Sequence, residues 1–412
     1  MTDVLLVAYH YPPISSAGTQ RAVSFLKHLP QHGYRVHVLT TNAFGQESPD
    51  TAYRASELVG GYRAIFNPAA RDLLPHIRSR TRTGSARSLL SRLGRRLLIP
   101  DAQVGWLPSA YRVARHILNS QPIGVVLTTG PPFSSHLLGL ALRKTENLPW
   151  VADFRDTWTH DPLDESITSP LRSSVESWME RLVLEGATRV TCVTDIAAGV
   201  LGTHTQKPVS VIPNGYEARS PATGARREKS GPVRFVHTGS FSTSHPRRSP
   251  ESLVRAAQML GDEVDFELVF VGPLDENEIA MIQPLVDSGR AIVTGAVSSD
   301  EALGWQDRAD VLVVVDHPRD VLASNVPGKV YEYGASGKPI LAIVPPGATD
   351  RLITEMEAGI CVRHDPKEIA VAITAMANGT SGLSPDKRKW QQFDRGKSAE
   401  KMARVLSEVM EN

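Results

Sequence analysis

Residues 325–340 have the sequence NVPGKVYEYGASGKPI, which carries the signals of a helix followed by a strand. Pro327 suits the first turn of a helix, where its missing N–H would have no partner, and Asn325 is a candidate cap. Gly337 is expected to end the helix, and Pro339 then leads into an apolar run. A helix followed directly by a buried strand is the repeating unit of an α/β protein.

Glu332 lies in the middle of this predicted helix, among residues that are mostly small or apolar. A carboxylate in that position can accept hydrogen bonds from both hydroxyls of a ribose. The alternative is a solvated helix face, and the segment taken alone supports both interpretations equally.

Short apolar runs alternate with helical stretches along the whole chain. The first half contains the runs 4–8, 36–39, 125–127, 150–152 and 190–193. The second half contains the runs 234–237, 267–271, 291–293, 311–315 and 340–344. Buried strands that alternate with helices form parallel sheets, so we predict an α/β fold with two Rossmann-like, doubly wound domains. Such sheets bind ligands at the carboxyl ends of their strands, and two of them would face a common cleft.

A length of 412 residues also favours two domains. The linker candidate is Pro213-Asn214-Gly215-Tyr216 with the polar stretch that follows as far as Gly231. We therefore expect an N-terminal domain over residues 1–212 and a C-terminal domain over residues 213–389.

The composition predicts a cytoplasmic protein. Lys and Arg number 45 and Asp and Glu 44, so the net charge of +1 indicates no nucleic-acid partner. The two cysteines, Cys192 and Cys361, lie far apart in apolar runs, which is typical of reduced, buried thiols. Residues 2–8 predict a buried strand rather than a signal peptide, and no apolar run approaches the roughly 20 residues of a membrane span.

Two loops carry residues suited to an anion. Gly18 precedes a predicted helix at residues 20–29, where backbone N–H groups and the helix dipole favour a phosphate, although such a glycine is more often just a turn. Arg247 and Arg248 follow the strand 234–237, and their guanidinium groups suit a diphosphate. The alternative for the second loop is a surface loop that happens to contain arginines.

A third loop, Asp153-Phe154-Arg155-Asp156, follows the strand 150–152. Three charged groups so close to the end of a buried strand favour the rim of a site. The alternative is an internal Asp–Arg ion pair that shapes the loop. No metal-binding pattern occurs, such as an Asp-x-Asp pair after an apolar strand, so a diphosphate would be neutralised by Arg, Lys and helix N-termini.

Four pieces in a fixed order resemble the retaining glycosyltransferases of family 4, which have the GT-B fold. They are Tyr9–Arg21, Ile212-Pro213-Asn214-Gly215 at the domain junction, the loop Thr238-Gly239-Ser240, and Val326–Ile340. The resemblance covers nearly the whole chain. It implies that residues 390–412 form a final helix that packs back onto the N-terminal domain.

The resemblance also implies roles for single residues. Gly18 would bind the donor phosphates through its backbone, and Glu332, as the second Glu of the family's Glu-x7-Glu motif, would bind the ribose. Gly295 would lie in the loop that meets the base, and Arg247 or Arg248 would replace the family's phosphate-binding basic residues. The backbone amides that would face the diphosphate lie near Pro327, Gly328 and Lys329.

Two positions depart from the family pattern. Ser324 replaces the first Glu of the motif, which usually contacts the transferred sugar, so the identity of the sugar stays open. Ser240 replaces the arginine of the usual Gly-Arg in the phosphate loop. Charge compensation then falls to Arg247, Arg248 or Lys329.

The predicted reaction transfers a hexose-type sugar from a UDP- or GDP-sugar to an acceptor with retention of configuration, and it uses no metal or other cofactor. Arg248 and Lys329 would stabilise the departing diphosphate. Front-face attack, in which the donor phosphate helps to deprotonate the acceptor, needs no protein nucleophile. Asp153 and Asp156 are candidates for a base or for acceptor positioning, and His136 is a weaker one.

Residues 77–100 contain arginines among leucines and no acidic residue. This pattern fits a basic amphipathic helix on an anionic membrane, a collar for a phosphorylated acceptor, or a solvated loop. The acceptor is accordingly predicted to be a small molecule, a lipid-linked glycan or a natural product bound to a carrier protein. Peripheral contact with the inner face of the membrane is one alternative within a cytoplasmic location.

Two other functions fit the same architecture. A nucleotide-sugar 2-epimerase would lack an acceptor surface, so the Arg-rich stretch and the loop at Asp153 argue against it. A non-catalytic nucleotide-sugar-binding protein would explain Ser324. A nicotinamide dehydrogenase is disfavoured, because no Gly-x-Gly-x-x-Gly follows the first strand.

Overall fold

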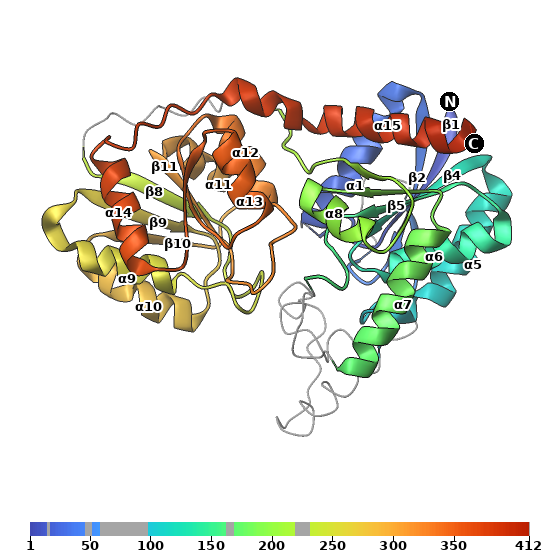
Figure 1. Ribbon diagram of the computed structural model, residues 1–412, viewed down its shortest axis with the longest axis horizontal. Coiled ribbons are helices and arrows are strands. Elements are labelled where there is room, and N and C mark those ends of the chain that lie inside the picture. Colours follow the sequence, from blue (N-terminus) through green and yellow to red (C-terminus); the bar gives the residue numbers. More distant parts are fainter. Residues whose placement is uncertain (15–16, 46–51, 58–97, 162–168, 219–230, 412) are drawn as a thin grey trace. The chain divides into compact units, whose positions relative to one another are not determined.

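The computed structural model describes residues 1–14, 17–45, 52–57, 98–161, 169–218 and 231–411. The chain divides into two compact units, which Figure 1 shows with their helices and strands. The N-terminal unit comprises Met1–Asn214 together with Arg395–Asn412, and the C-terminal unit comprises Gly215–Asp394. Each unit is built on one parallel sheet, as the alternation of apolar runs and helical stretches predicts.

The sheet of the N-terminal unit has seven strands in the order β3-β2-β1-β4-β5-β6-β7. They are β1 (Thr2–Ala8), β2 (Tyr34–Thr41), β3 (Tyr53–Ala55), β4 (Ile123–Gly130), β5 (Trp150–Phe154), β6 (Arg189–Cys192) and β7 (Val209–Val211). The helices are α1 (Ala17–His28), α5 (Leu107–Ser120), α6 (Ser134–Glu146), α7 (Pro170–Gly186), α8 (Asp195–Gly202) and α15 (Arg395–Glu411). Because β1 lies between β2 and β4, the strand order reverses beside it, and the loop after β1 lies at this switch point.

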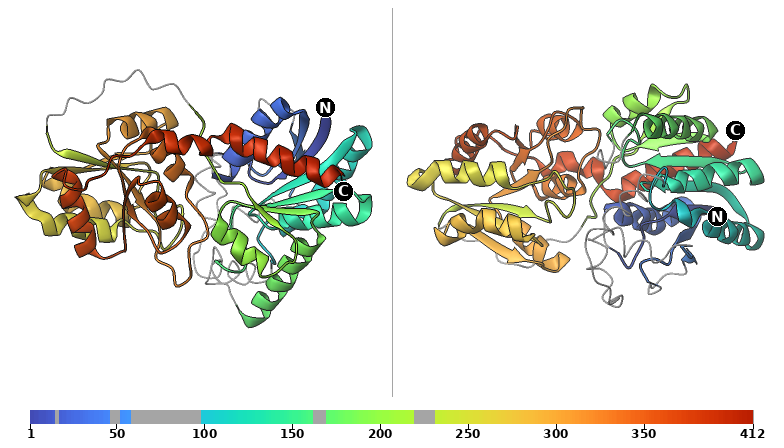
Figure 2. Two further views of the ribbon diagram at one scale, coloured as in Figure 1. Left: turned by 45° about the horizontal axis from the view of Figure 1, so that its top comes forward. Right: turned by 90° about the horizontal axis from the view of Figure 1, so that it is seen from below.

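Alternate residues of β1 enter two separate hydrophobic cores. Leu5 packs in the core that contains Trp106, whereas Leu6 packs in the core that contains Phe25 of α1 and Leu406 of α15. The alternation is the expected result of strand geometry, which directs neighbouring side chains to opposite faces of a sheet. The helix α15 lies beside α1 in both Figure 1 and Figure 2.

The sheet of the C-terminal unit has six strands in the order β10-β9-β8-β11-β12-β13. They are β8 (Val233–Thr238), β9 (Phe266–Val271), β10 (Ala291–Gly295), β11 (Val311–Val315), β12 (Ile340–Ile343) and β13 (Gly359–Val362). The helices are α9 (Glu251–Leu260), α10 (Glu276–Asp287), α11 (Ser299–Arg308), α12 (Gly328–Ser336), α13 (Ala348–Glu355) and α14 (Pro366–Ala377). The switch point of this sheet lies between β8 and β11, where the strand order reverses.

The helix predicted within residues 325–340 is α12. Gly337 ends it in the left-handed conformation, with φ of 73°, as the sequence predicts. Asn325 does not cap the helix, because the residue before α12 is Pro327. The side-chain oxygen of Asn325 instead accepts a hydrogen bond from Arg319 at 3.3 Å.

The stretch predicted as one helix over residues 390–412 is divided. Lys387–Phe393 forms a 3-10 helix of the C-terminal unit, and α15 begins only at Arg395. The cause is the burial of Trp390, whose ring lies so close to Gly334 that a Cβ added there would be 2.1 Å from it. This contact holds the 3-10 helix against α12 and separates it from α15.

The structure bears on two expectations that were drawn from the composition. Cys192 and Cys361 are free thiols, the first buried and the second partly buried. In the part of the chain that the structure describes, no helix has the length and apolar character needed to cross a membrane. Most of the Arg-rich stretch, residues 77–97, lies outside the described residues.

Candidate functional site

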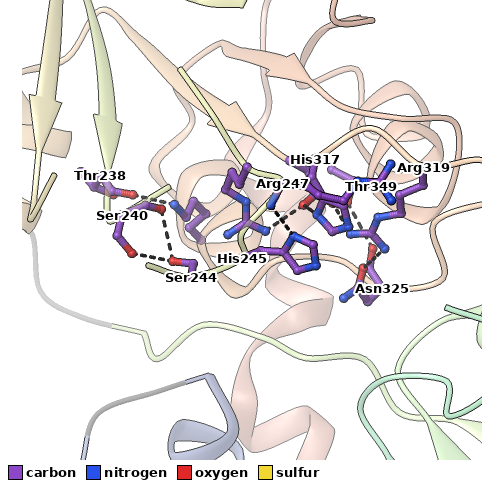
Figure 3. A network of polar contacts seen from close by, with 12 residues as sticks. Thr238, Ser240, Ser244, His245, Arg247, His317, Arg319, Asn325 and Thr349 are labelled. Atoms are coloured by element: carbon purple, nitrogen blue, oxygen red, sulfur yellow. Dashed lines mark hydrogen bonds and ion pairs between the residues drawn. The ribbon is translucent and has the colours of Figure 1, made fainter. Parts of the chain in front are cut away.

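A buried carboxylate organises the cations at the switch point of the C-terminal sheet. Asp316 directly follows β11 and is 1 % exposed. Arg248 donates a hydrogen bond to its Oδ1 at 2.8 Å, and Arg319 donates one to its Oδ2 at 2.6 Å. Figure 3 shows this network at the ends of the strands, with Arg319 and Asn325 labelled. Two guanidinium groups are thereby held beside one carboxylate, so the group of three carries a net positive charge.

The charge state of Asp316 follows from these contacts. Burial opposes ionisation of the carboxyl, but the hydrogen bond to His317 at 3.1 Å and the charges of Arg319 and Arg248 outweigh it. They hold the pKa of Asp316 far below its usual range. His317 also stacks on His245 with ring centroids 3.6 Å apart, and burial, with His317 and Arg248 nearby, lowers the pKa of His245 to about 4. The His245 ring is therefore neutral at pH 7.

Lys329 adds a third cation from the first turn of α12. Its Nζ donates a hydrogen bond to the carbonyl oxygen of Thr238 at 2.6 Å. Gly239 makes room for this ammonium group, because a Cβ there would lie 3.1 Å from Nζ and the backbone φ is 104°. Burial and the charge of Arg248 lower the pKa of Lys329 to about 7, opposed by Glu332 and Asp316. A further anion beside it would raise that pKa.

A tyrosine fixes α12 to the end of β8. The hydroxyl of Tyr333 lies 2.8 Å from Thr238 Oγ1 and accepts a hydrogen bond from the N–H of Thr238 at 3.2 Å. Tyr331 and Tyr333 are buried, whereas Glu332 between them is only partly buried. The helix therefore presents Lys329 and Glu332 on its more open side, one turn apart.

Glycines line the neighbouring strand ends. The N–H of Gly239 donates to the carbonyl of Val271 at 2.7 Å, and the N–H of Gly272 donates to the carbonyl of Gly295 at 3.1 Å. A Cβ on Gly272 would lie 2.9 Å from the carbonyl oxygen of Gly239. The predicted residues Gly239 and Gly295 thus lie at one edge of the sheet. Gly272 lies between them and was not predicted from the sequence.

The other predicted residues of this unit lie around the cluster. Ser240 Oγ is 2.5 Å from Ser244 Oγ, and Arg247 is exposed, its N–H donating to His245 Nδ1 at 3.2 Å. Ser324 is buried, next to Asn325, and Gly328 has open space where a side chain would lie. Arg248 joins the cluster through its ion pair with Asp316.

Asp153 is enclosed in an internal ion pair, which favours a structural role over the predicted one as a base or acceptor-positioning group. Its carboxylate is fully buried and receives two hydrogen bonds from Arg21, at 2.8 and 2.7 Å. Thr129 and Thr191 donate two more, at 2.9 and 2.8 Å. Burial would raise the pKa of Asp153, but the charge and hydrogen bonds of Arg21 and both threonines lower it. The alternative of an internal ion pair is correct, with Arg21 rather than Arg155 as the partner.

The remaining candidates of the N-terminal unit differ in exposure. Asp156 is partly buried in the loop after β5, and its charge acts on Arg155. His136 is fully buried with Nδ1 2.8 Å from Thr128 Oγ1, and burial lowers its pKa to about 3, which describes a neutral core histidine. Gly18 is the second residue of α1, and the space above its Cα is occupied by the guanidinium group of Arg155.

Two family models match the chain. The glycosyl transferase 4-like domain matches residues 17–215, and the glycosyl transferases group 1 domain matches residues 232–378. The chain belongs to the group 1 glycosyltransferases. The cation cluster thus lies within the group 1 domain of this glycosyltransferase, and the Arg21–Asp153 pair lies within its 4-like domain.

Solved structures share the fold over the whole length of this glycosyltransferase. Sucrose-phosphate synthase from Thermosynechococcus elongatus is 17 % identical, with a TM-score of 0.64 over 100 % of this chain and 96 % of the other. Anabaena HepE in complex with UDP and glucose is 14 % identical, with a TM-score of 0.63 over 99 % and 100 %. A putative UDP-N-acetylglucosamine 2-epimerase from Listeria monocytogenes is 11 % identical, with a TM-score of 0.58 over 100 % and 97 %. The fold is GT-B, as predicted. No curated protein matches the sequence.

The site residues that sequence reasoning missed follow one rule. Asp316, His317 and Arg319 stand directly after β11, which pairs with β8. The carboxyl ends of neighbouring parallel strands lie at one edge of the sheet. The loop after residues 311–315 was therefore as good a candidate for site residues as the loop after β8. Among the described residues, no group of three or more His, Cys, Asp or Glu could hold a metal ion.

Proposed function

We propose that this glycosyltransferase moves a hexose-type sugar from a UDP- or GDP-sugar to an acceptor, with retention of configuration and without a metal ion. The observation that carries the proposal is the pairing of Arg248 and Arg319 with one buried carboxylate, Asp316, at the switch point of the C-terminal sheet, where Lys329 is held at the carbonyl of Thr238. Guanidinium and ammonium groups gathered in this way suit the oxygens of a nucleotide diphosphate.

The same residues account for departure of the leaving group. Charge builds up on the diphosphate as the glycosidic bond breaks, and Arg248 and Lys329 lie ready to stabilise it. Lys329, with a pKa of about 7 in the free protein, would become fully protonated beside the diphosphate. Asp316 would keep Arg248 and Arg319 in place, so little reorganisation would be needed at the moment of reaction.

The helix α12 would select the nucleotide. Glu332 would accept hydrogen bonds from the ribose hydroxyls, and the amide groups near Pro327, Gly328 and Lys329 would meet the phosphates at the helix N-terminus. Gly295 would lie beside the base. Ser324 stands where the family's sugar-binding carboxylate would be, so a hydroxyl would replace that contact. The complex of HepE with UDP and glucose supports a uridine nucleotide.

The acceptor would bind to the N-terminal unit. Asp156 remains the carboxylate proposed to position it, because the carboxylate of Asp153 is enclosed. The unit also has a polar cavity of about 400 Å³. It is lined by Thr159, His160, Ser173, Glu176, Ser177, Val200, Thr203 and His204. These hydroxyl, imidazole and carboxylate groups suit a polyhydroxylated acceptor, which would be lipid-linked, carrier-bound or small.

A thermal-shift screen against UDP-, GDP-, dTDP- and ADP-sugars tests the proposal. A ligand that binds the folded state at 100 times its dissociation constant stabilises it by about 2.7 kcal/mol, so the correct donor should stand out. Stabilisation by a UDP- or GDP-sugar, followed by its slow hydrolysis or transfer, is expected. A protein stabilised by none of the four would contradict the proposal.

A 2-epimerase activity is the second candidate, because the Listeria protein shares the fold over nearly its whole length. The two functions separate in one experiment. Incubation with a UDP-N-acetylhexosamine and no acceptor would produce the 2-epimer without releasing UDP if the protein were an epimerase. Release of UDP and free sugar, with no epimer, supports glycosyl transfer.

A further inference from the structure

One buried carboxylate connects three segments that bound the polar cavity of the N-terminal unit. Glu180, in the middle of α7, is 1 % exposed. Its Oε2 accepts a hydrogen bond from Thr159, in the loop after β5, at 2.5 Å. The same oxygen lies 3.2 Å from Nδ1 of His204, which follows α8. These contacts hold the walls in place, so the space of about 400 Å³ between them is already formed without a ligand.

A second carboxylate, that of Glu176, lines this space. Glu176 lies one turn before Glu180 on α7 and is 8 % exposed. Its Oε1 accepts a hydrogen bond from Nε of Arg172 at 2.8 Å. In the part of the chain that the structure describes, its Oε2 has no hydrogen-bond partner. The cavity is therefore the place from which a hydrogen-bond donor would reach this oxygen.

The surroundings of Glu176 disfavour its negative charge. Burial raises the pKa of Glu176, and although the charge and the hydrogen bond of Arg172 oppose this, the carboxylates of Asp101 and Glu180 add to the rise. A cation that entered the cavity and bonded to Oε2 would offset both the burial and the repulsion between the carboxylates. The electrostatics of the cavity therefore favour a positively charged ligand.

The rest of the lining suits a hydroxylated ligand rather than an anion. Ser173 and Ser177 contribute hydroxyls from α7, and Thr203 contributes one from the end of α8. Among the described residues that line the cavity there is no lysine or arginine. A phosphate group placed here would meet the carboxylate of Glu176 with no cation of the lining to bind it, so a phosphorylated ligand is disfavoured.

We propose that this cavity binds the protonated amine of a hydroxylated ligand, with the ammonium group at Oε2 of Glu176 and the ligand's hydroxyls at Ser173, Ser177 and Thr203. An acceptor that carries an amino group, such as an amino sugar, has this chemistry. That the ligand is the acceptor rests on the proposed glycosyl transfer, whereas the binding of an amine does not.

Titration of the full-length protein with glucamine and with sorbitol, followed by ligand-observed NMR at equal ionic strength, tests the site. The two molecules share a hydroxylated six-carbon chain, but glucamine carries a primary amine, which is protonated at pH 7. Because glucamine alone forms a charge-assisted hydrogen bond to Glu176, it should bind at least about tenfold more tightly than sorbitol. Equal affinity for the two, or no binding of glucamine, would overturn the proposal.

Two variants should abolish the binding of glucamine for different reasons. Glu176→Gln keeps the size of the side chain but removes its charge, and Ser177→Leu keeps the charge but fills part of the cavity. Glu185→Gln and Ser174→Leu make the same changes at exposed positions of α7 outside the lining, and they should bind glucamine as the wild type does. Thermal unfolding checks that each variant is folded. Binding that persists in either folded cavity variant, or that is lost in the controls as well, contradicts the assignment.

The source of the amine is distinguished by incubation with the nucleotide sugar that stabilises the protein. If the site holds the acceptor, mass spectrometry should detect glycosylated glucamine, in which a hydroxyl oxygen has replaced the nucleotide diphosphate at the anomeric carbon, and Glu176→Gln should form less of it. If glucamine binds but is not glycosylated, the site holds a separate amine ligand. A failure of the proposed transferase function would appear differently, as the absence of stabilisation by any nucleotide sugar while glucamine still binds.

Discussion

Arg21 and Asp153 form a buried, two-point ion pair that joins α1 to the end of β5. The distances are 2.7 and 2.8 Å, and Thr129 and Thr191 complete the shell of the carboxylate. Nη2 of Arg21 also donates to the carbonyl of Ile212 at 3.0 Å. The pair therefore ties together three parts of the N-terminal unit that lie far apart in sequence.

Asp153→Ala is expected to lower the free energy of unfolding by about 3–5 kcal/mol, because it leaves the Arg21 charge buried without its partner. Urea denaturation measures this. Glu146→Ala, which removes a partly exposed pair with Arg115 at 3.1 Å, is the control and should cost at most about 1 kcal/mol. A stable but inactive Asp153→Ala protein would restore the catalytic interpretation.

Stability should fall in acid as Asp153 and Asp316 become protonated. The pKa of each carboxyl is lower in the folded protein than its ordinary value of 3.8. Their stabilisation is therefore complete above pH 3.8 and is lost as the pH falls from there toward the folded-state pKa values. Urea midpoints measured downward from pH 6 check this. Asp316→Asn should flatten the profile, and an unchanged profile would contradict the assignment.

The affinity for a UDP-sugar should decrease as the pH rises through about 7. Lys329 has a pKa of about 7 in the free protein, and only its protonated form stabilises a diphosphate. A UDP-sugar is the correct ligand, since its diphosphate diester does not titrate in this range. Lys329→Met should bind more weakly at low pH and lose the dependence near pH 7. The same pH profile in wild type and variant would exclude Lys329.

Transfer or hydrolysis of the donor should survive EDTA, because Arg248, Arg319 and Lys329 are proposed to take the place of a divalent ion at the diphosphate. Assays with EDTA and with added Mg²⁺ or Mn²⁺ measure this. A strict requirement for either ion would contradict the metal-free account.

The sequence predicted the parallel sheets and α12 because their signals are local. Apolar runs mark most strands, and Pro327 and Gly337 bracket the helix in the chain itself. The strands β3 and β7 were missed, since these short segments lack a continuous run of buried apolar residues, and β13 was indicated only by the apolar run around Cys361. Local signals did not predict where the final helix begins, because a contact between residues distant in sequence sets that boundary. Trp390 packs on Gly334 and interrupts the helix.

The site was predicted in part for the same reason. Arg248 was found from the loop after β8 and Lys329 from the start of α12, but the partner that orders Arg248 is Asp316, 68 residues away. The partner of Asp153 could not be predicted for the same reason. Its carboxylate pairs with Arg21, which is 132 residues away, rather than with the nearby Arg155. Pairing over such distances depends on the packed sheet and helices rather than on the spacing of charges in the chain.

Calorimetric titration of UDP and GDP into the wild type and Glu332→Ala tests the central claim most directly. Glu355→Ala, which removes an exposed carboxylate on α13 of the same unit, is the control. We expect one nucleotide to bind, Glu355→Ala to match the wild type, and Glu332→Ala to lose about 1–3 kcal/mol of binding free energy through the lost ribose hydrogen bonds. Unchanged affinity in Glu332→Ala, or no binding of either nucleotide to the wild type, would contradict the account.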